Sequence, residues 1–389
     1  MDDSVPTLQD PPVGEPTTDG IIDSQDDPDL NAADLKGDIT ANITLSNAQT
    51  WNLTGELAVK DGATLTIEAG TRLEASVGGT NVFLVVEQGA SIIADGTAAA
   101  PITFTSAAAN PRAGDWGGIL INGFAGISGG GTSTTEVLPL SYGGTDDTDN
   151  SGILDYVIIE YTGARINGEQ EFNGLTLYGV GSGTQLSNII INKGDDDGIE
   201  FFGGTASIEN LLVVDSRDDL FDWTQGYRGT ANSNWYGVRT IGFTAVSEDP
   251  RGIEGDGNLD GRSPDDANQS NPTITNVTIL NNGIINMADF VKIRRGSSAT
   301  ITGLHLGFNF NNNGDANPSA SDTVDLNDGR GDAIAATSIT GTVDVMSGVN
   351  IMEIENNSGA TVTLTDAVTP SVDINTFMWS GLVGELLEQ

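Results

Sequence analysis

The sequence predicts an all-β fold, a right-handed single-stranded parallel β-helix of roughly ten coils. A repeat that begins at Asn188 recurs about 22 residues later at Asn210, and again at Asn276, three such periods further on. Each repeat joins a short run rich in β-branched residues to a turn of Gly, Asn and Asp, and the repeats carry no helical pattern. Coils of this length are typical of a solenoid in which each coil packs only against its neighbours.

The first segment, residues 1–34, is expected to be a disordered acidic tether, because it is rich in Asp and Pro and has no Lys or Arg before Ala33. The chain contains no apolar run long enough to span a membrane. Its start lacks the basic and apolar parts of a secretory signal. We therefore interpret Met1 as an addition to a mature sequence that has lost its signal peptide. The expected location is extracellular, or on the cell surface as a lipoprotein anchored in the outer membrane.

The β-helix is expected to span residues 35–376. Alternating polar and apolar residues begin at Leu35, and Gly-Ala turns separate the next strands. Acidic loops at about 243–271 and 309–332 interrupt the pattern, and such insertions usually project from one face of a repeat scaffold. Residues 377–389 are more apolar and compatible with a helix, so they are expected to cap the open end of the solenoid.

Several short motifs, in their order and spacing, carry a family resemblance. They are Gly-Ala-Thr-Leu-Thr-Ile-Glu-Ala-Gly-Thr at 62–71, Ala-Asp-Gly-Thr at 94–97, Pro-Ile-Thr-Phe-Thr-Ser at 101–106, Trp-Gly-Gly-Ile-Leu-Ile-Asn-Gly at 116–123, Asp-Asn-Ser-Gly at 149–152 and Asp-Asp-Asp-Gly-Ile-Glu-Phe-Phe-Gly-Gly at 195–204. The chain resembles a large family of secreted or lipid-anchored β-helix proteins, with the pectin-lyase-like superfold, from marine and other Gram-negative bacteria. The resemblance is clearest over residues 35–242. It implies the fold and the location, but no family activity or catalytic residue.

The composition limits the possible partners. Lys and Arg number 15 against 55 Asp and Glu, a formal net charge of −40, which argues against binding nucleic acid or an anionic membrane. Cysteine is absent, so neither disulfides nor zinc–thiolate sites hold the turns. Calcium, which prefers oxygen ligands, is the cofactor that this composition predicts.

The first candidate metal site is a group of aspartates on two successive repeats. Stacking of successive coils should place Asp196 on Asp218 and Asp197 on Asp219, at about the 4.8 Å spacing of neighbouring strands. Such carboxylates need a cation or basic partners, for which Lys193 and Arg217 are the nearest candidates in the sequence. A metal site, a salt-bridged ladder and a catalytic centre all remain open for the set Asp195, Asp196, Asp197, Asp218, Asp219 and Asp222.

Two further turns resemble the start of a calcium loop of the Asp-x-Asn-x-Asp-Gly type. One contains Asp256, Asn258 and Asp260, but Ala267 occupies the twelfth position, where an acid is needed, so Asp265 or Asp266 would have to substitute. The other contains Asp147 and Asp149. A solvated acidic loop and a turn held by Asx hydrogen bonds are the alternatives for the two segments.

Aromatic residues follow the aspartate group closely and could stack on sugar rings, although aromatics in solenoids more often fill the core. The candidate ligand-binding residues are Trp223, Tyr227, Trp235 and Tyr236. A polygalacturonase-like reaction would use the aspartates with Lys292 and Arg294. A calcium-dependent lyase would use Lys292, Arg294 or Arg295 as a base. Both signatures are incomplete, and His305, the only histidine, lies in an alternating strand.

Three functions follow from these observations. The leading one is a non-enzymatic cell-surface protein, stabilised by calcium, with a binding, adhesive or structural role, whose partner is a carbohydrate or another surface component. The second is a calcium-dependent polysaccharide lyase or glycoside hydrolase. The third is a homo-oligomeric subunit of a surface layer or filament, since open solenoid ends can stack.

Overall fold

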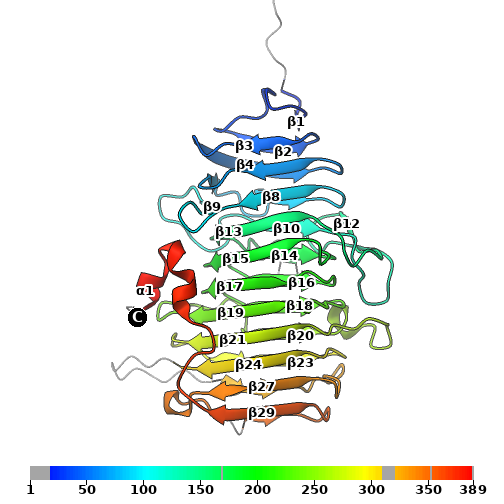
Figure 1. Ribbon diagram of the computed structural model, residues 1–389, viewed down its shortest axis with the longest axis vertical. Helices are drawn as coiled ribbons and strands as arrows, with labels where there is room; N and C mark the ends of the chain where they lie inside the picture. Colours follow the sequence, from blue (N-terminus) through cyan, green and yellow to red (C-terminus); the bar gives the residue numbers. More distant parts are fainter. Residues whose placement is uncertain (1–17, 168–169, 309–319, 351–352, 388–389) are drawn as a thin grey trace, which may run out of the picture.

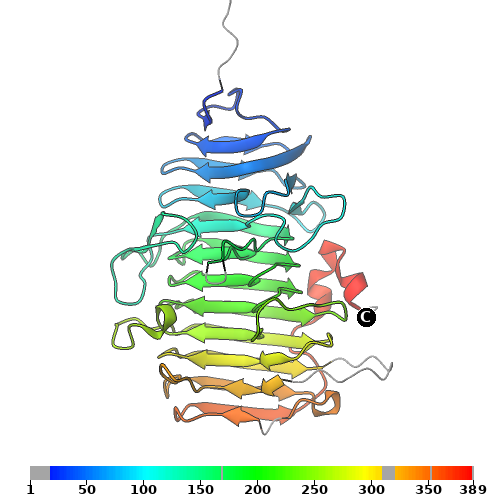
Figure 2. The same cartoon turned by 180° about the vertical axis from the view of Figure 1, so that it is seen from behind.

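The computed structural model describes residues 18–167, 170–308, 320–350 and 353–387. They form a right-handed parallel β-helix whose coils stack along one axis, as Figures 1 and 2 show. Every pairing in its main sheet of 25 strands is parallel, and the strands form three ladders along the sides of the solenoid. The predicted fold class is confirmed.

The first ladder carries the candidate site and contributes one strand per coil. In β4, this ladder uses mainly the second half of the strand, where Leu57 to Val59 pair with both β2 and β7. In the described residues this ladder runs through β1 (Ile21–Ile22), β2 (Leu35–Ile39), β4 (Thr50–Val59), β7 (Phe83–Val86), β10 (Ile119–Asn122), β14 (Leu175–Tyr178), β16 (Ile199–Phe202), β18 (Phe221–Thr224), β20 (Ile253–Asp256), β23 (Val291–Arg294), β26 (Val324–Asp325) and β28 (Ile354–Glu355).

The second and third ladders share long strands. The second starts with β3 (Ile43–Leu45), β5 (Thr64–Ile67) and β8 (Ser91–Asp95), and the third with the first half of β4, β6 (Arg72–Ala75) and β9 (Ile102–Ser106). From there, one long strand per coil supplies both ladders, its first half pairing in the second and its second half in the third. These strands are β13 (Gly152–Glu160), β15 (Gln185–Asn192), β17 (Ile208–Val214), β19 (Asn232–Arg239), β21 (Thr273–Asn281), β24 (Thr300–Gly307), β27 (Ser338–Val343) and β29 (Thr361–Asp366).

A column of asparagines marks the bend between these two ladders. Asn188, Asn210, Asn234 and Asn276 have φ of 49°, 60°, 58° and 59°, in the left-handed region that Asn tolerates better than most residues. The side-chain amides of Asn210, Asn234 and Asn276 each donate to the asparagine one coil before, over 3.0 to 3.1 Å. The ladder corrects the predicted spacing: the stretch from Asn210 to Asn276 holds two coils, of 24 and 42 residues, rather than three equal ones, because the second contains the long insertion.

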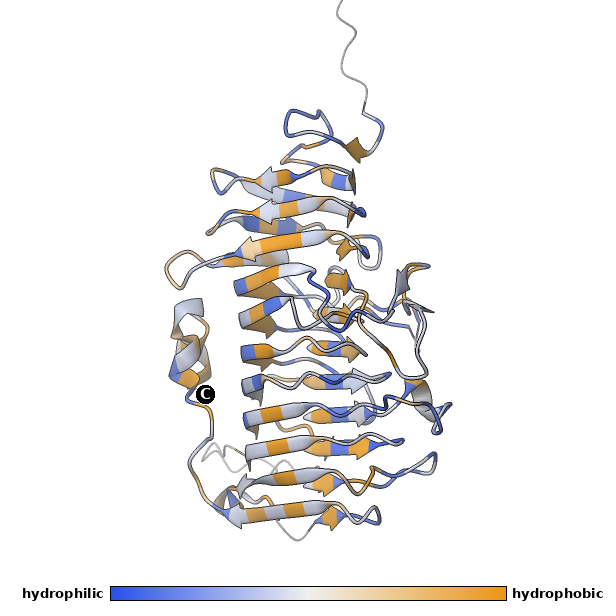
Figure 3. Ribbon diagram, turned by 45° about the vertical axis from the view of Figure 1, so that its right-hand side comes forward, coloured by the Kyte–Doolittle hydropathy of each residue, from blue (hydrophilic) through white to orange (hydrophobic). Residues whose placement is uncertain are grey.

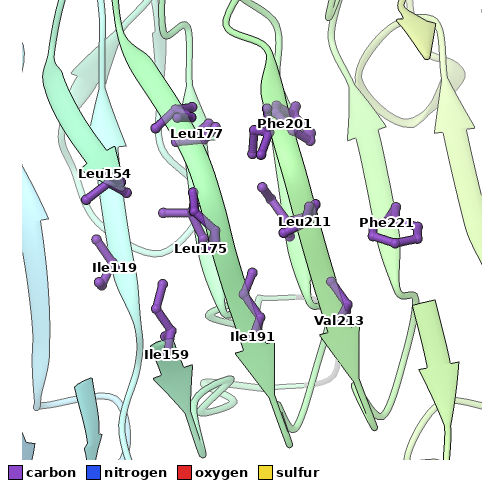
Figure 4. Close-up of a cluster of buried hydrophobic side chains, with 14 of the residues drawn as sticks. Ile119, Leu154, Ile159, Leu175, Leu177, Ile191, Phe201, Leu211, Val213 and Phe221 are labelled. Atoms are coloured by element: carbon purple, nitrogen blue, oxygen red, sulfur yellow. The ribbon is translucent and has the colours of Figure 1, made fainter. Parts of the chain in front are cut away.

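The interior is a continuous apolar core that follows the axis. Ile119, Leu175 and Ile191 project inward from neighbouring coils, with other aliphatic residues around them (Figure 4). Aromatic rings stack in the middle coils, where the centroid of Phe201 lies 4.1 Å from that of Tyr227 and 6.0 Å from that of Trp235. Inward and outward residues alternate along a strand. Core residues flank Glu200 and Asp222, and Ile253 precedes Glu254, so these carboxylates face outward.

The N-terminal segment differs from the prediction where the structure describes it. Residues 18–34 are not a tether: they add β1 to the first ladder, Ile22 is fully buried, and Leu30 and Ala32 pack on the core. Three apolar side chains thus cover the first coil. Residues 1–17 of the predicted tether lie outside the described part of the chain.

The C-terminal segment also departs from the prediction. The 3₁₀-helix η3 (Ile374–Ser380) and the helix α1 (Val383–Leu387) run back along the side of the solenoid rather than over its end, as Figure 1 shows in red. Phe377 and Val383 are fully buried against outward residues of the third ladder, among them Leu212 and Tyr236. The apolar pattern of this segment therefore matches a lateral apolar face of the third ladder.

The insertions contain strands of the solenoid. Strand β20 lies inside the first predicted loop, followed by the 3₁₀-helix η1 (Leu259–Gly261), and β26 lies inside the second. Residues 309–319 of the second loop are outside the described residues. The remaining elements are the hairpin of β11 (Ser133–Thr134) and β12 (Ser141–Tyr142), the parallel pair of β22 (Met287–Asp289) and β25 (Ala320–Asp322), and the 3₁₀-helix η2 (Val345–Ser347). Figure 3 shows the polar loops projecting from one side.

Candidate functional site

A cavity of about 680 Å³ lies on the outer face of the first ladder, over strands β16 to β23. We call it the carboxylate groove. Nine carboxylates and five arginines line it: Glu136, Asp197, Glu200, Asp218, Asp219, Asp222, Asp249, Glu254, Asp256, Arg251, Arg262, Arg294, Arg295 and Arg330. The lining is therefore acidic on balance, and it gathers side chains from at least four coils.

The predicted register of the aspartates is confirmed. Glu200 pairs with Asp222, which pairs with Glu254 on the next coil, so these three carboxylates form a column along the floor of the groove. In the preceding turn, the backbone amide of Asp219 donates to Oδ1 of Asp197 over 2.8 Å. Regular stacking thus places acidic side chains of successive coils side by side.

The carboxylates of the floor form two groups that share one residue. Oxygens of Asp197, Glu200 and Asp222 lie within 4.8 Å of one another, and so do oxygens of Asp219, Asp222 and Glu254. Within the residues described, no Lys or Arg forms an ion pair with Asp197, Asp219 or Asp222. Oδ1 of Asp222 is buried and has no hydrogen-bond partner there. A cation at either group would meet at least three oxygen ligands, the type that calcium prefers.

Burial and mutual repulsion shift the ionisation of these groups. Burial, followed by the charges of Asp196 and Asp222, raises the pKa of Asp197 well above its usual range. Burial also raises the pKa of Asp222 strongly, with Glu200 and Glu254 adding to the shift. A bound divalent cation would oppose these shifts, because an opposite charge favours the ionised form.

The six predicted aspartates divide into two sets. Asp197, Asp218, Asp219 and Asp222 line the groove. Asp195 and Asp196 face a second side, where Arg165 donates to Oδ1 of Asp196 over 2.6 Å and Arg217 pairs with Asp195. Arg217 is thus a partner, as the sequence indicated, but Lys193 is not among the ion pairs of the described residues and lies 5.8 Å from the ring centroid of Tyr161. Asp195 and Asp196 are thus salt-bridged, whereas the other four aspartates have no ion pair with Lys or Arg among the described residues.

In the first predicted calcium loop, the described side chains of Asp256 and Asn258 each have protein partners. Asp256 ends β20 and pairs with Arg294 over 2.9 Å and with Arg295. Asn258 is buried, and its amide donates to the backbone oxygen of Arg295 over 3.0 Å. The side chain of Asp260 is outside the described part of the structure. Asp256 and Asn258 thus fix the arginine wall of the groove.

The second predicted loop lies away from the groove floor. Asp147 is exposed, accepts from the backbone amide of Gly126 over 2.9 Å and pairs with Arg228. Asp149 accepts from the hydroxyl of Ser151 over 3.2 Å. Neither belongs to the groups of three acidic residues that the described residues form. Their contacts are those of the turn that was the alternative to calcium.

The predicted aromatic platform is wrong. Trp223, Tyr227 and Trp235 are fully buried inside the solenoid, where their rings pack on one another and on phenylalanines. Tyr236 points outward but is covered by the C-terminal segment. Because strand alternation sets these directions, the closeness of the aromatics to the aspartates in the sequence did not place them in the groove.

Three residues of the groove were not predicted from the sequence: Glu200, Glu254 and Arg251. Glu200 lies one repeat period before Asp222, so the repeat could have identified Glu200. The next step, from Asp222 to Glu254, is longer than one period because of the insertion, and this hid both Glu254 and Arg251. Arg251 is buried and pairs with Glu254 and Asp289.

Fold and groove together define a parallel β-helix with a polar site on the outer face of one ladder. The chain belongs to the family of pectate-lyase-like beta helix domains, whose model matches residues 37–372. No curated protein and no solved structure gave a significant match. Among the described helices, none is both long and apolar enough to cross a membrane.

Proposed function

We propose that the protein is a non-enzymatic, extracellular β-helix that binds calcium in the carboxylate groove, and that the calcium-loaded groove binds an acidic polysaccharide. The observation that carries the proposal is the pair of carboxylate groups that share Asp222, whose buried Oδ1 has no partner in the described residues. Calcium takes six to eight oxygens, so protein ligands would leave positions for ligand oxygens. The excess of acidic residues suits an exterior rich in salt and divalent cations.

The basic residues of the groove favour binding over an elimination reaction. Burial lowers the pKa of Arg251, but Glu254 and other carboxylates raise it above its ordinary value, and Glu254 and Asp256 do the same for Arg294. Lys292 is buried and pairs with Asp325. A lyase needs a basic side chain that can lose its proton, and the carboxylates around Arg251 and Arg294 oppose that loss.

One observation favours a glycoside hydrolase as the second candidate. Such enzymes use one protonated and one ionised carboxyl. The pKa values of Asp197, Glu200 and Asp222 are raised, so one of these carboxyls would carry the proton when no cation is bound. Calcium binding and acid catalysis by the same carboxyls exclude each other. Release of reducing ends or unsaturated products from polygalacturonate or alginate would therefore overturn the non-enzymatic proposal.

Calorimetry with calcium at constant ionic strength tests the cation site. Asp222→Asn should weaken calcium binding at least tenfold, since both carboxylate groups contain Asp222. Glu209→Gln is the matched control, because Glu209 is exposed on β17, in the coil that leads to Asp222, but on the second ladder. Equal affinity of the two variants would remove the proposed site.

A further inference from the structure

The outward side chains of the first ladder change character abruptly along the solenoid. In register on successive coils they are apolar at Ala58, Val85 and Leu120, and after Thr176 they become acidic at Glu200. The apolar part is buried although it faces outward. Something other than solvent must therefore cover the ladder on the N-terminal side of the groove.

The cover is the long loop between β10 and β13. Its hairpin places Val137, Leu138 and Leu140 on the same apolar cluster as Val85 and Leu120. Tyr142, from this hairpin, lies with its ring centroid 4.8 Å from that of Tyr178, which stacks at 4.5 Å on Phe202. This row of packed rings lies across the first ladder at β14, and Tyr142 and Phe202 border the groove there.

The loop between β10 and β13 is also bonded to the segments that follow β18 and η1. The backbone amide of Ser128 donates to the oxygen of Gln225 over 2.9 Å, and that of Gly129 donates to the oxygen of Ala267 over 3.0 Å. The hydroxyl of Tyr142 also donates to the side-chain oxygen of Gln225. The loop thus forms a wall that is part of the packed structure. Thr134 and Glu136 of the wall line the cavity, and so does Gln170, whose side-chain amide donates to the backbone oxygen of Glu136 over 2.9 Å.

We propose that the carboxylate groove binds the end of a polysaccharide chain and cannot bind its middle, an inference that rests on the proposed function. The terminal sugar would lie against Tyr142, Glu136 and Gln170, and the following sugars would run over Asp222 toward Arg294. The volume of about 680 Å³ falls within the range of about 300–1,000 Å³ typical of clefts and cavities that bind small ligands. It suits a few sugar units.

The test asks whether binding capacity follows the number of polysaccharide chain ends or the total mass of polysaccharide. Calcium-loaded protein is titrated with polygalacturonate before and after partial cleavage to a tenfold larger number of chains of the same total mass. A chain-end site predicts that binding capacity per gram rises about tenfold. A capacity that stays constant, or an absence of binding to polygalacturonate and to alginate cleaved in the same way, would overturn the inference.

Two further measurements separate the inference from the proposed function. Calcium affinity, measured without polysaccharide, reports on the cation site alone. If the native protein did not bind calcium, the proposed function itself would be wrong. Replacing 136–142 by a Gly-Ser linker removes Tyr142 with the apolar cover, so it should open the wall and let uncleaved polymer bind along its length. If this variant fails to fold, the capacity measurement on the native protein still decides, with Glu209→Gln as the control.

Discussion

The backbone amide of Asp219 donates to Oδ1 of Asp197 over 2.8 Å, from one coil to the next. This bond fixes the stacking of two acidic turns. It occupies only one oxygen of Asp197, and the charge of Asp197 has no basic partner in the described residues. The same stacking brings Asp196, Asp197 and Asp218 within 4.8 Å of one another. The turns thus hold negative charges close together at a cost that a cation would relieve.

The first prediction concerns Asp196 and Asp218. If they share one cation, Asp196→Asn and Asp218→Asn should each weaken calcium binding, and the double variant should lose little more than either single one, because both remove the same site. Titration calorimetry on the three variants gives the coupling. Fully additive, small changes in stability with unaltered calcium affinity would show that the pair belongs only to a solvated turn.

The second prediction is a dependence of stability on pH. Burial raises the pKa of Asp197, Glu200, Asp219 and Asp222 above their unfolded values of about 4, so the folded state binds more protons than the unfolded state. Their contribution to stability is full below pH of about 4 and is lost as the pH rises toward the folded values. Without calcium, the melting temperature should therefore fall over this window.

Calcium should flatten that dependence, because a cation bound only by the folded state stabilises it by mass action and favours ionised carboxylates. At free calcium of about 1,000 times Kd the gain would be about 4 kcal/mol per site. Melting curves with calcium and with sodium of equal ionic strength make the comparison. Identical curves would mean that screening alone is at work.

The third prediction concerns the asparagine ladder. Asn210 has φ of 60°, donates to Asn188 and accepts from Asn234. Asn210→Ala should lower the free energy of unfolding by about 2 kcal/mol, from a strained left-handed backbone and two lost hydrogen bonds. Asn210→Gly keeps the backbone freedom and should lose less. Denaturant unfolding of both variants checks the order, and a more stable Ala variant would contradict it.

The repeat predicted the fold and half of the site for a physical reason. The recurrence of the Asn188 segment at Asn210 implies stacked coils, and stacking alone puts Asp197 beside Asp219. The groove also depends on where insertions fall, and these follow no period. Glu254 lies inside the predicted loop at 243–271, so it could not be aligned with Asp222 by counting.

The direction of side chains was harder to predict for the aromatics. Trp223 and Asp222 are adjacent in β18, yet one fills the core and the other faces the groove. Alternation predicts this once the strand is placed, but a run in which both neighbours of Asp222 are aromatic also fits an exposed sugar platform. Likewise, the apolar C-terminal segment fits either an end cap or a lateral cover, and sequence alone does not say which surface is vacant.

The last prediction tests the lateral cover formed by η3 and α1. Phe377 is fully buried against the third ladder, whereas Met378, its neighbour in η3, is 56% exposed. Phe377→Ala should weaken docking of residues 372–387 by about 3–5 kcal/mol, the usual range for a buried Phe. Met378→Ala should change it little, because that side chain buries much less surface.

Hydrogen exchange measured by mass spectrometry separates these variants. In Phe377→Ala, amides of residues 372–387 should exchange faster, while those of the inner strands β15 and β17 keep their protection, because each coil is held mainly by its neighbours. Leu212 and Val238 would then become accessible, so the variant should also bind more of an apolar dye. Loss of protection throughout the β-helix would instead show that this segment is required for the whole fold, and equal exchange in both variants would show that Phe377 does not anchor it.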